Sequence, residues 1–414
     1  MLSRCPVSTS ETTAPLEDDP PLFSGEFAAL LAAALAFGLA HSAYFLLPKF
    51  LAVELHANAS EIGGYSSLTW FANVALVAFV GIWIDRRGRL PLAFAGAALM
   101  TLTGVGFLGV DALGPWLVCL RIAHGFAFTL FFVATSTLAA DLAPPRRLGQ
   151  ALGLFGAMMV STNALAPAAA EWLANSAGWS AVFSATALMA ALSGLLLLGV
   201  RERPHTRGEA REIPGLRSVF ARPGLAVVLI ASALAGVTFG AMFTFHQPYA
   251  LSLGITRVSD FLVAYAIAAV IVRGLLGGVA DRLGRRQVAI FALTLYGMSP
   301  IAMALLGATG FSWIGALLGL AHGLFYPALN ALIVEGAEDD VRGKLMAVYN
   351  GAFNVGFSIG SLALGYVAEA AGYGLVFTLG GVCSFAALAL LARRAPRLRA
   401  RSAPRKESRE VRTQ

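Results

Sequence analysis

Charged residues are scarce in this chain of 414 residues: they make up 13% of it, against 57% hydrophobic residues. Soluble domains carry about 25% charged residues, so the chain has too little polar surface for a water-soluble globule. The mean hydropathy is +0.73. Apolar runs of about 18 residues or more recur along the chain, close to the ~20 residues that cross a bilayer. The composition therefore predicts an all-α polytopic membrane protein.

The chain also lacks the groups on which most enzymatic sites depend. Its three cysteines, Cys5, Cys119 and Cys383, lie far apart, so neither a disulfide nor a metal site is expected. No glycine-rich loop ends in Gly-Lys-Ser or Gly-Lys-Thr, which excludes an ATP-driven pump. No paired carboxylates, nucleophile triad or cluster of metal ligands stands out. We therefore expect no cofactor, no metal and no enzymatic activity, and energy must come from a gradient.

Twelve apolar runs predict twelve transmembrane helices, six on each side of a polar connector. They lie at about 26–47, 61–83, 91–110, 114–139, 149–172, 180–200, 225–249, 259–280, 287–307, 313–334, 344–368 and 373–392. The predicted organisation is a cytoplasmic tail at 1–25, a six-helix bundle at 26–200, a cytoplasmic linker at 201–224, a second six-helix bundle at 225–392 and a basic cytoplasmic tail at 393–414.

Basic residues are distributed unevenly between the two sides of the membrane. With both termini in the cytoplasm, the short inner connections hold sixteen Lys and Arg, whereas the outer ones hold two, Lys49 and Arg257. Such a bias orients a chain with its basic connections inside. The net charge of +7 is thus an orientation signal, and the basic tail is expected to contact anionic lipid rather than nucleic acid. The predicted location is the plasma membrane, which is the inner membrane in a Gram-negative bacterium.

One polar segment occurs twice in the chain. Gly81-Ile-Trp-Ile-Asp-Arg-Arg-Gly-Arg returns 196 positions later as Gly277-Gly-Val-Ala-Asp-Arg-Leu-Gly-Arg. Ala-His-Gly at 123–125 likewise recurs at 321–323, and Pro48 and Pro248 are expected to end the first and seventh spans. Because the offsets stay between 195 and 200, the sequence predicts two like halves, related by an axis along the membrane normal.

These motifs resemble those of the major facilitator superfamily. The doubled segment is similar to that family's loop signature; it is complete in the second half, whereas Leu90 stands where a second base is usual in the first. Leu117-x-x-x-Arg121-x-x-His124-Gly125 is similar to the span-four motif, with His in place of Gln. The resemblance covers about residues 26–392. It implies two pseudo-symmetric six-helix bundles that open a solute site to each side of the membrane in turn.

The doubled loop motif is expected to act at the cytoplasmic ends of its helices. Gly81 and Gly277 would let a neighbouring helix approach closely, and Gly88 and Gly284 would permit a tight turn. The resemblance implies that the motif latches the two halves in one state, whereas the simpler interpretation is that its bases only set topology. The charged members are Asp85, Arg86, Arg89, Asp281, Arg282, Arg285 and Arg286.

Two arginines lie deep in spans. Arg121 lies about 10 Å inside the fourth span at ~1.5 Å per residue, where a charge costs at least ~2.5 kcal/mol. The resemblance places it beside a central cavity, with a role in substrate or proton binding. The alternative is a packing arginine whose head group reaches outward. Arg273 in the eighth span is similarly deep, and no family motif supports it.

Four histidines, His41, His124, His246 and His322, fall on spans one, four, seven and ten, which line the cavity in the family. Histidine changes charge between about pH 5 and 8, so a cluster there would suit a coupling proton or a substrate. The alternative, strongest for the repeated pair at 124 and 322, is a helix-packing element. The remaining candidates for substrate or proton coupling are the polar residues Tyr44, Gln247, Tyr326 and Asn330.

Neutral polar groups in spans more commonly form interhelical hydrogen bonds than ligand contacts, so the same alternative applies to those four residues. Acidic residues are absent from the centres of the spans. Glu171 and three other glutamates lie at span ends, where we expect water to reach them. This leaves proton coupling without its usual carboxylate.

The fifth span bears on the direction of transport. It carries Pro167 but has alanines where drug:proton antiporters of the family have glycines. With the short linker and the aromatic, weakly charged spans, this favours proton-coupled export of a small amphipathic or hydrophobic solute by a monomer. A proton symporter importing a small metabolite, such as a sugar or organic acid, is the alternative within transport. A non-transporting receptor or scaffold on the same fold is the alternative outside it.

Overall fold

The chain is helical in the computed structural model, which describes residues 23–144, 147–202, 224–276, 284–333 and 339–394. Ten segments of this part are long and apolar enough to cross a membrane, with α1 to α2 counted as one, and α3 and α10 complete the predicted twelve. The first half consists of α1 (Gly25–Ala43), η1 (Tyr44–Leu46), α2 (Leu47–Val53), α3 (Ala59–Arg87), α4 (Leu90–Phe107), α5 (Pro115–Leu142), α6 (Leu148–Ala177) and α7 (Trp179–Leu197). The second half consists of α9 (Leu225–Ser252), α10 (Ser259–Leu276), α12 (Arg285–Leu306), η3 (Gly307–Gly310), α13 (Phe311–Ile333), α14 (Asp339–Ala371) and α15 (Tyr373–Arg394).

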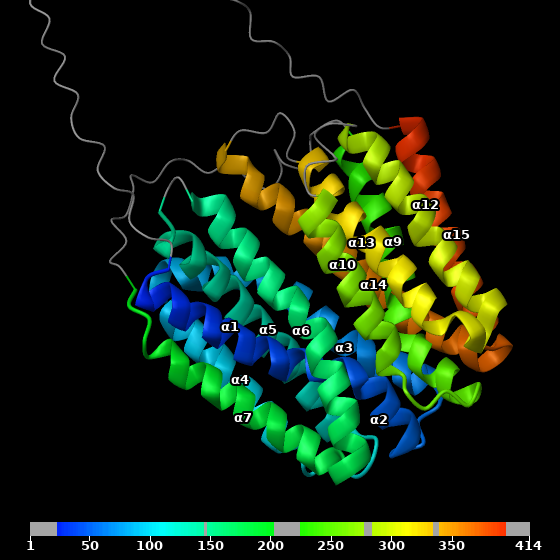
Figure 1. Cartoon of the computed structure of the whole chain (residues 1–414), viewed down its shortest axis with the longest axis horizontal. Helices are drawn as coiled ribbons and strands as arrows, with labels where there is room; N and C mark the ends of the chain where they lie inside the picture. The colour runs from blue at the N-terminus through cyan, green and yellow to red at the C-terminus, as the bar shows by residue number, and fades with distance from the viewer. Residues whose placement is uncertain (1–22, 145–146, 203–223, 277–283, 334–338, 395–414) are drawn as a thin grey trace, which may run out of the picture.

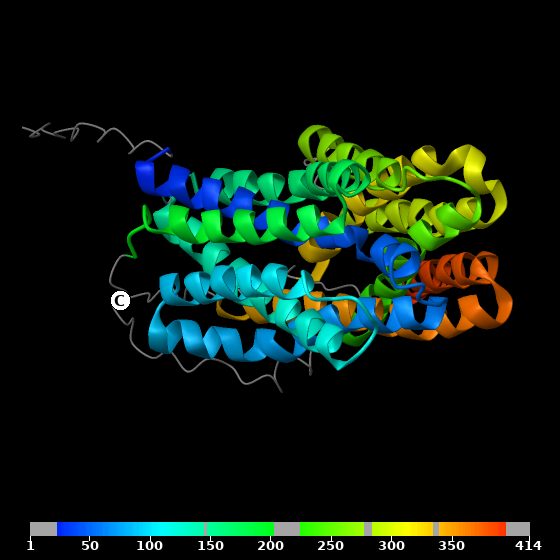
Figure 2. The ribbon, with the colours of Figure 1, turned by 90° about the horizontal axis from the view of Figure 1, so that it is seen from below.

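The helices pair in the same way in both halves. In the first half α1 packs on α6 and α7, α5 packs on α3 and α4, and α4 packs on α7. In the second half α9 packs on α14 and α15, α13 packs on α10 and α12, and α12 packs on α15. One cluster of buried apolar side chains lies within the first half, and a second is centred on the second half but also takes in first-half residues such as Leu46 and Val182. Figure 1 shows the two groups of helices inclined to one another, and Figure 2 shows them from below.

Glycines with left-handed backbone mark equivalent corners of the two halves. Gly88 and Gly284 precede α4 and α12 with φ of 85° and 92°, and Gly178 and Gly372 separate α6 from α7 and α14 from α15 with φ of 82° and 81°. A side chain would strain the backbone at such angles. Gly88 thus makes the turn expected there, Gly284 has the equivalent backbone at the start of α12, and Gly178 and Gly372 extend the repeat to a second pair of corners.

Two pairs of helices make most of the contacts between the halves, and α9 adds smaller contacts with α2 and α3. α3 lies against α14, and α6 lies against α10. The Asn354 amide donates to Oδ1 of Asn73 across the first pair, at 2.9 Å, and Nδ2 of Asn73 donates to the Thr129 hydroxyl at 2.7 Å. The interhelical hydrogen bond expected of a neutral polar residue in a span is thus observed for Asn354.

Both prolines that we expected to end spans lie inside continuing helical segments. Pro48 is in the first turn of α2, which carries the first span on to Val53. Pro248 lies inside α9, which ends at Ser252. Proline is tolerated in a first helical turn because the N–H it lacks has no intrahelical partner there. The expectation was therefore wrong at both positions, and within the first span a 3-10 turn, η1, separates α1 from α2.

Candidate functional site

A small cavity lies between the two halves. Its lining comes from the region of η1, from α3 and α5 on one side, and from α9 and α14 on the other: Tyr44, Phe45, Leu47, Pro48, Ser66, Trp70, Arg121, Phe243, Thr244 and Phe357. The volume is about 40 Å³, enough for a few water molecules and too small for a drug-sized ligand. The lining is largely aromatic, with Arg121 as its charged member.

A chain of hydrogen bonds leads from the cavity into the first half. Nε of Arg121 donates to the carbonyl of Tyr65 at 3.0 Å, and Nη1 lies 2.9 Å from Nδ1 of His124. Nε2 of His124 in turn lies 2.9 Å from Nδ1 of His41. Arg121, His124 and His41 are 5%, 2% and 5% exposed. Residues three apart share a helix face, and from that face of α5 His124 reaches His41 on α1, whereas Arg121 also reaches Tyr65 on α3.

The arginine fixes where both imidazoles carry their protons. A guanidinium has donors and no acceptor, so Nη1 of Arg121 donates to Nδ1 of His124. His124 then carries its proton on Nε2 and donates it to Nδ1 of His41. An additional proton on either Nδ1 would face another donor and break one link of the chain. In this conformation the Arg121–His124–His41 chain is therefore complete only with both histidines neutral.

Aromatic rings enclose this chain. The Tyr44 ring lies 4.5 Å from that of His124, and the Phe128 ring stacks on His41 at 4.1 Å. The Tyr44 hydroxyl is 3.5 Å from Oγ1 of Thr186, and Tyr44 also lines the cavity. A low local dielectric strengthens the hydrogen bonds of such a chain and makes an unpaired charge in it costly. Any rearrangement of Arg121 must therefore be accompanied by a new partner.

The four span histidines do not form one cluster. His246 is fully buried, with Nδ1 2.7 Å from the carbonyl of Met242 and its ring stacked on Phe261. Nδ1 of His322 lies 3.4 Å from the Tyr296 hydroxyl, and its ring stacks on Phe239. Only His41 and His124 lie beside Arg121. The expectation of a four-histidine cavity is therefore wrong, because the two histidines of the second half pack into that half's own core.

The other polar candidates are dispersed. Nε of Arg273 and Oδ1 of Asn330 are buried without a hydrogen-bond partner among the described residues. The side chain of Tyr326 lies outside what the structure describes. In the part of the chain that the structure covers, no group of three or more His, Cys, Asp or Glu is placed to hold a metal ion.

The repeated Ala-His-Gly motif has a packing role in both halves. A Cβ on Gly125 would overlap the carbonyl oxygen of Thr69 on α3, and a Cβ on Gly323 would lie 3.2 Å from the carbonyl oxygen of Ala269 on α10. The glycine therefore allows equivalent helices to approach in each half. The histidines differ: His124 meets an arginine, whereas the position three residues before His322 is Gly319.

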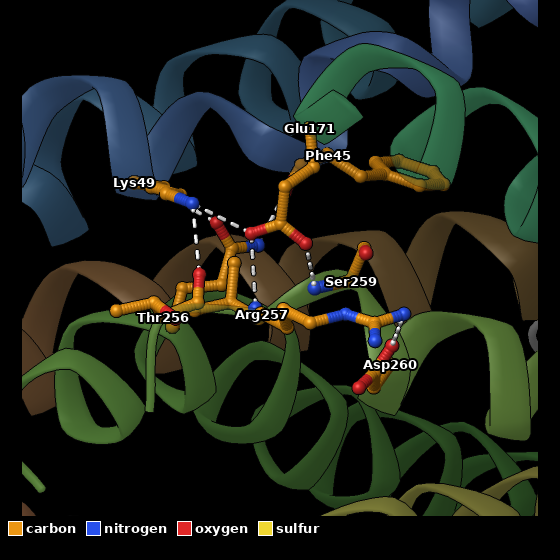
Figure 3. Close-up of polar contacts among 9 residues, drawn as sticks. Phe45, Lys49, Glu171, Thr256, Arg257, Ser259 and Asp260 are labelled. Atoms are coloured by element: carbon orange, nitrogen blue, oxygen red, sulfur yellow. Dashed lines mark hydrogen bonds and ion pairs between the residues drawn. The ribbon is translucent and has the colours of Figure 1, made fainter. Parts of the chain in front are cut away.

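A second polar site joins the two halves at the end of the bundle where α2 meets α3. The charge pattern predicts that this side faces outward, and we call it the outer side. Nζ of Lys49 pairs with Oε1 of Glu171 at 2.6 Å and donates to the carbonyl of Thr256 at 2.9 Å. The Glu171 oxygens also accept from the backbone N–H groups of Val258 and Ser259, both at 2.9 Å. Figure 3 shows this arrangement.

Sequence reasoning missed this second site. Glu171 is 3% exposed and Lys49 8%, so the expectation that water reaches Glu171 was wrong. Both residues lie near the ends of apolar runs, a position typical of solvated charges. The available signal was that Lys49 directly follows a proline inside an otherwise apolar run.

Gln247 belongs to this outer site and not to the cavity lining. Its Nε2 donates to the carbonyl of Phe45 at 2.5 Å, and its Oε1 accepts from the backbone N–H of Lys49 at 3.1 Å. Phe45 and Lys49 are four residues apart, so an unbroken α-helix would join these two backbone groups directly. A side chain of the second half thus completes the backbone hydrogen bonding of the first.

The loop motif makes its described contacts within each half. Nε of Arg89 lies 3.0 Å from Oδ2 of Asp141, at the end of α5, and the Glu202 carboxylate accepts from the backbone N–H of Arg89 and Leu90 at 2.7 and 3.1 Å. Nη2 of Arg286 donates to the carbonyl of Ala392 at 2.7 Å. In this conformation these contacts hold helix ends of one half together, and the latch between halves stays a prediction.

Other members of the motif contribute less or cannot be placed. Among the described residues, no heavy atom lies within 4 Å of the position that a Cβ would take at Gly81, so they do not make the close helix approach expected there. Arg86 is exposed. Gly277, Asp281 and Arg282 lie outside the described residues, as do the side chains of Asp85 and Arg285.

Comparison with known proteins identifies the family. The family model described as Major Facilitator Superfamily matches residues 28–315 and again 249–414. The chain belongs to the Major Facilitator Superfamily. It is therefore a secondary transporter and not an enzyme. The resemblance drawn from the loop and span-four motifs is confirmed.

Curated relatives of this superfamily member include efflux proteins. The chain is 28% identical over 382 residues to multidrug resistance protein MdtG of Citrobacter koseri, covering 84% of this chain and 91% of that one. It is 25% identical over 353 residues to the multi-drug resistance efflux pump PmrA homolog of Lactococcus lactis subsp. lactis, covering 79% and 85%.

Solved structures share the fold. A nucleoside transporter matches with a TM-score of 0.75 at 15% identity, covering 89% of this chain and 99% of that one. A D-xylose-proton symporter matches with a TM-score of 0.73 at 16% identity, covering 92% and 99%. The predicted all-α fold is confirmed.

Proposed function

We propose that this protein exports small amphipathic or hydrophobic molecules across the plasma membrane in exchange for protons, as a monomer with both termini in the cytoplasm. The observation that carries the proposal is the aromatic cavity between the halves with the buried Arg121–His124–His41 chain beside it. Efflux relatives over most of the chain support the direction. The bias of basic residues supports the orientation.

The chain of hydrogen bonds gives proton exchange a physical basis. It is complete only when neither histidine holds an extra proton, so proton binding and this arrangement of Arg121 exclude one another. A proton on Nδ1 of His124 displaces the Arg121 side chain, which lines the cavity, and so disfavours the solute, whereas a solute that binds with Arg121 still on His124 excludes the proton. Solute and proton are then coupled through one side chain, because each changes the free energy with which the other binds.

Reconstitution into liposomes tests the direction of coupling. With ethidium as the amphipathic probe, a pH gradient that drives protons from the outer to the cytoplasmic side should drive the dye the opposite way. A symporter importing a metabolite would instead move solute with the proton. A receptor or scaffold would move nothing under either gradient, and either of these outcomes overturns the proposal.

Arg121→Ala should abolish gradient-driven flux while leaving the protein folded, because it removes the charged member of the Arg121–His124–His41 hydrogen-bond chain. Thermal unfolding of the purified variant checks the fold. Undiminished flux through a folded Arg121→Ala variant would refute the role of the arginine.

A further inference from the structure

The outer site contains the features needed for a lock between the two halves. Lys49 and Glu171 belong to α2 and α6 of the first half, whereas Gln247 and the backbone of 256–259 belong to α9 and the start of α10 in the second. Glu171 is 3% exposed, and Gln247 is fully buried. The hydrogen bonds of Glu171 and Gln247 to the opposite half must break if the outer ends separate. We call this set of contacts the outer lock.

Glu171 must be ionised in the closed lock. Its Oε1 accepts from the Lys49 ammonium and from Val258 N–H, and its Oε2 accepts from Ser259 N–H. Ser259 begins α10, so the carboxylate meets the free N–H groups and the positive end of that helix. A proton on Glu171 would remove the negative charge that these donors face. It would also leave a buried ammonium without its counter-charge, which is strongly destabilising.

The other charged or titratable groups here do not replace that charge. On α9, His246 interacts electrostatically with Glu171, but a histidine side chain supplies no negative charge to Lys49. At the start of α10, Arg257 and Asp260 pair with one another, Nη2 to Oδ1, at 3.3 Å, and both are exposed. Figure 3 shows the Arg257–Asp260 pair beside the lock. Glu171 is thus the acid that pairs with Lys49.

Gln247 supplies the second part of the lock. Pro48 has no N–H, and the 3-10 turn η1 has drawn the carbonyl of Phe45 and the N–H of Lys49 out of their usual α-helical bond. The Gln247 amide bridges both groups. A buried backbone N–H or C=O left without a partner costs free energy comparable to a lost hydrogen bond. Withdrawal of Gln247 therefore requires α1 and α2 to rewind or to admit water.

We propose that the outer lock is proton-sensitive: it closes only when Glu171 is ionised, and a proton taken by Glu171 from the outer solution holds the outer side open. On opening, the carboxylate loses Val258 and Ser259 N–H and Lys49 as donors and binds a proton from water. On closing, that proton returns to water and the donors take its place. The inference rests on the proposed transport cycle, because it assigns one of that cycle's steps to Glu171 and Gln247.

Distances between spin labels test the lock directly. The labels are attached to Asp111→Cys and Ala371→Cys, two exposed outer positions on opposite halves, in the full chain with Cys5, Cys119 and Cys383 replaced by Ala. In the otherwise unaltered protein, lowering the pH from 8 to 3.5 should raise the ratio of open to closed populations by roughly 5- to 10-fold, because the closed lock admits no proton and a water-exposed glutamate, as in the open state, binds one near its ordinary pKa of ~4.3.

Three variants separate the parts of the mechanism. Glu171→Gln imitates the protonated acid and should stay open at both pH values. Gln247→Ala should open at pH 8 yet still respond to pH. Asp260→Asn, the matched control at an exposed neighbouring acid, should behave as the unaltered protein does.

A double variant guards against misfolding of Glu171→Gln. Lys49→Met with Glu171→Gln removes both charges while the new amide can still accept from α10, so it should stay closed and lose its pH response. The proposal would be overturned if Glu171→Gln responded to pH as the unaltered protein does. It would also be overturned if the Gln247→Ala variant stayed closed at pH 8. The labels report conformation without transport, so a protein that fails to move ethidium but follows this pattern refutes the proposed function and not the lock.

Discussion

At the scale of single residues, His124 is the position at which the proton hypothesis can be separated from packing. Glutamine there can accept from Arg121 through Oε1 and donate to His41 through Nε2, so it preserves the hydrogen bonds without binding a proton. We expect His124→Gln to keep solute counterflow within ~2-fold and to lower gradient-driven accumulation at least ~10-fold, as loss of a coupled proton predicts. Counterflow and accumulation are measured on the same liposomes. Equal accumulation by variant and parent would show that His124 only packs.

The residue scale also shows what the sequence could and could not predict. Arg121 was found because a charge deep in an apolar span is costly, and His124 because it is a histidine in the span-four motif. His41 lies 83 positions away, and its span is apolar on all sides, so no periodicity shows which face it presents. Lys49 and Glu171 were missed because charge at a span end usually contacts water, and only tertiary packing buries it.

At the scale of helices, the glycines at contact points determine how closely α3 and α5 pack. A methyl group on Gly125 would meet the backbone of Thr69, whereas one on Gly156, inside α6, would meet nothing within 4 Å. Gly125→Ala should therefore destabilise the protein by roughly 1–3 kcal/mol through overpacking. Gly156→Ala, the matched control, should leave stability unchanged or raise it by up to ~1 kcal/mol. Thermal unfolding in detergent compares the two, and equal melting temperatures would contradict the packing argument.

The apolar runs predicted that the helices exist and in which order they follow. They did not predict where the helices begin and end. The runs gave twelve segments, but α14 begins at Asp339 and α6 continues to Ala177, beyond the apolar residues. Helix ends depend on caps and corner glycines such as Gly178 rather than on hydropathy. Beside Pro48, the carbonyl of Phe45 and the N–H of Lys49 are paired by Gln247, which belongs to the other half. No local pattern contains that information.

At the scale of the whole molecule, each half has an apolar cluster of its own helices, the one centred on the second half also takes in a few residues of the first, and few polar links join the halves. The same five helix pairings occur inside each half, whereas α3–α14 and α6–α10 join them. Alternating access needs such a division, because each half can then move as a body while the contacts between halves exchange. The outer lock supplies the polar links on one side, and the contacts of Arg89 and Arg286 keep helix ends of each half together on the other.

This division predicts that the covalent linker can be cut. Residues 1–212 and 213–414, expressed together from separate genes, should assemble and retain gradient-driven ethidium flux, while neither piece should transport alone. Each piece contains most of one apolar cluster, and the lipid bilayer keeps both in one plane so that α3–α14 and α6–α10 can re-form. Co-purification through a tag on one piece measures assembly. Pieces that fail to associate, although each is stable in the membrane, would show that the halves depend on the linker to find their partners.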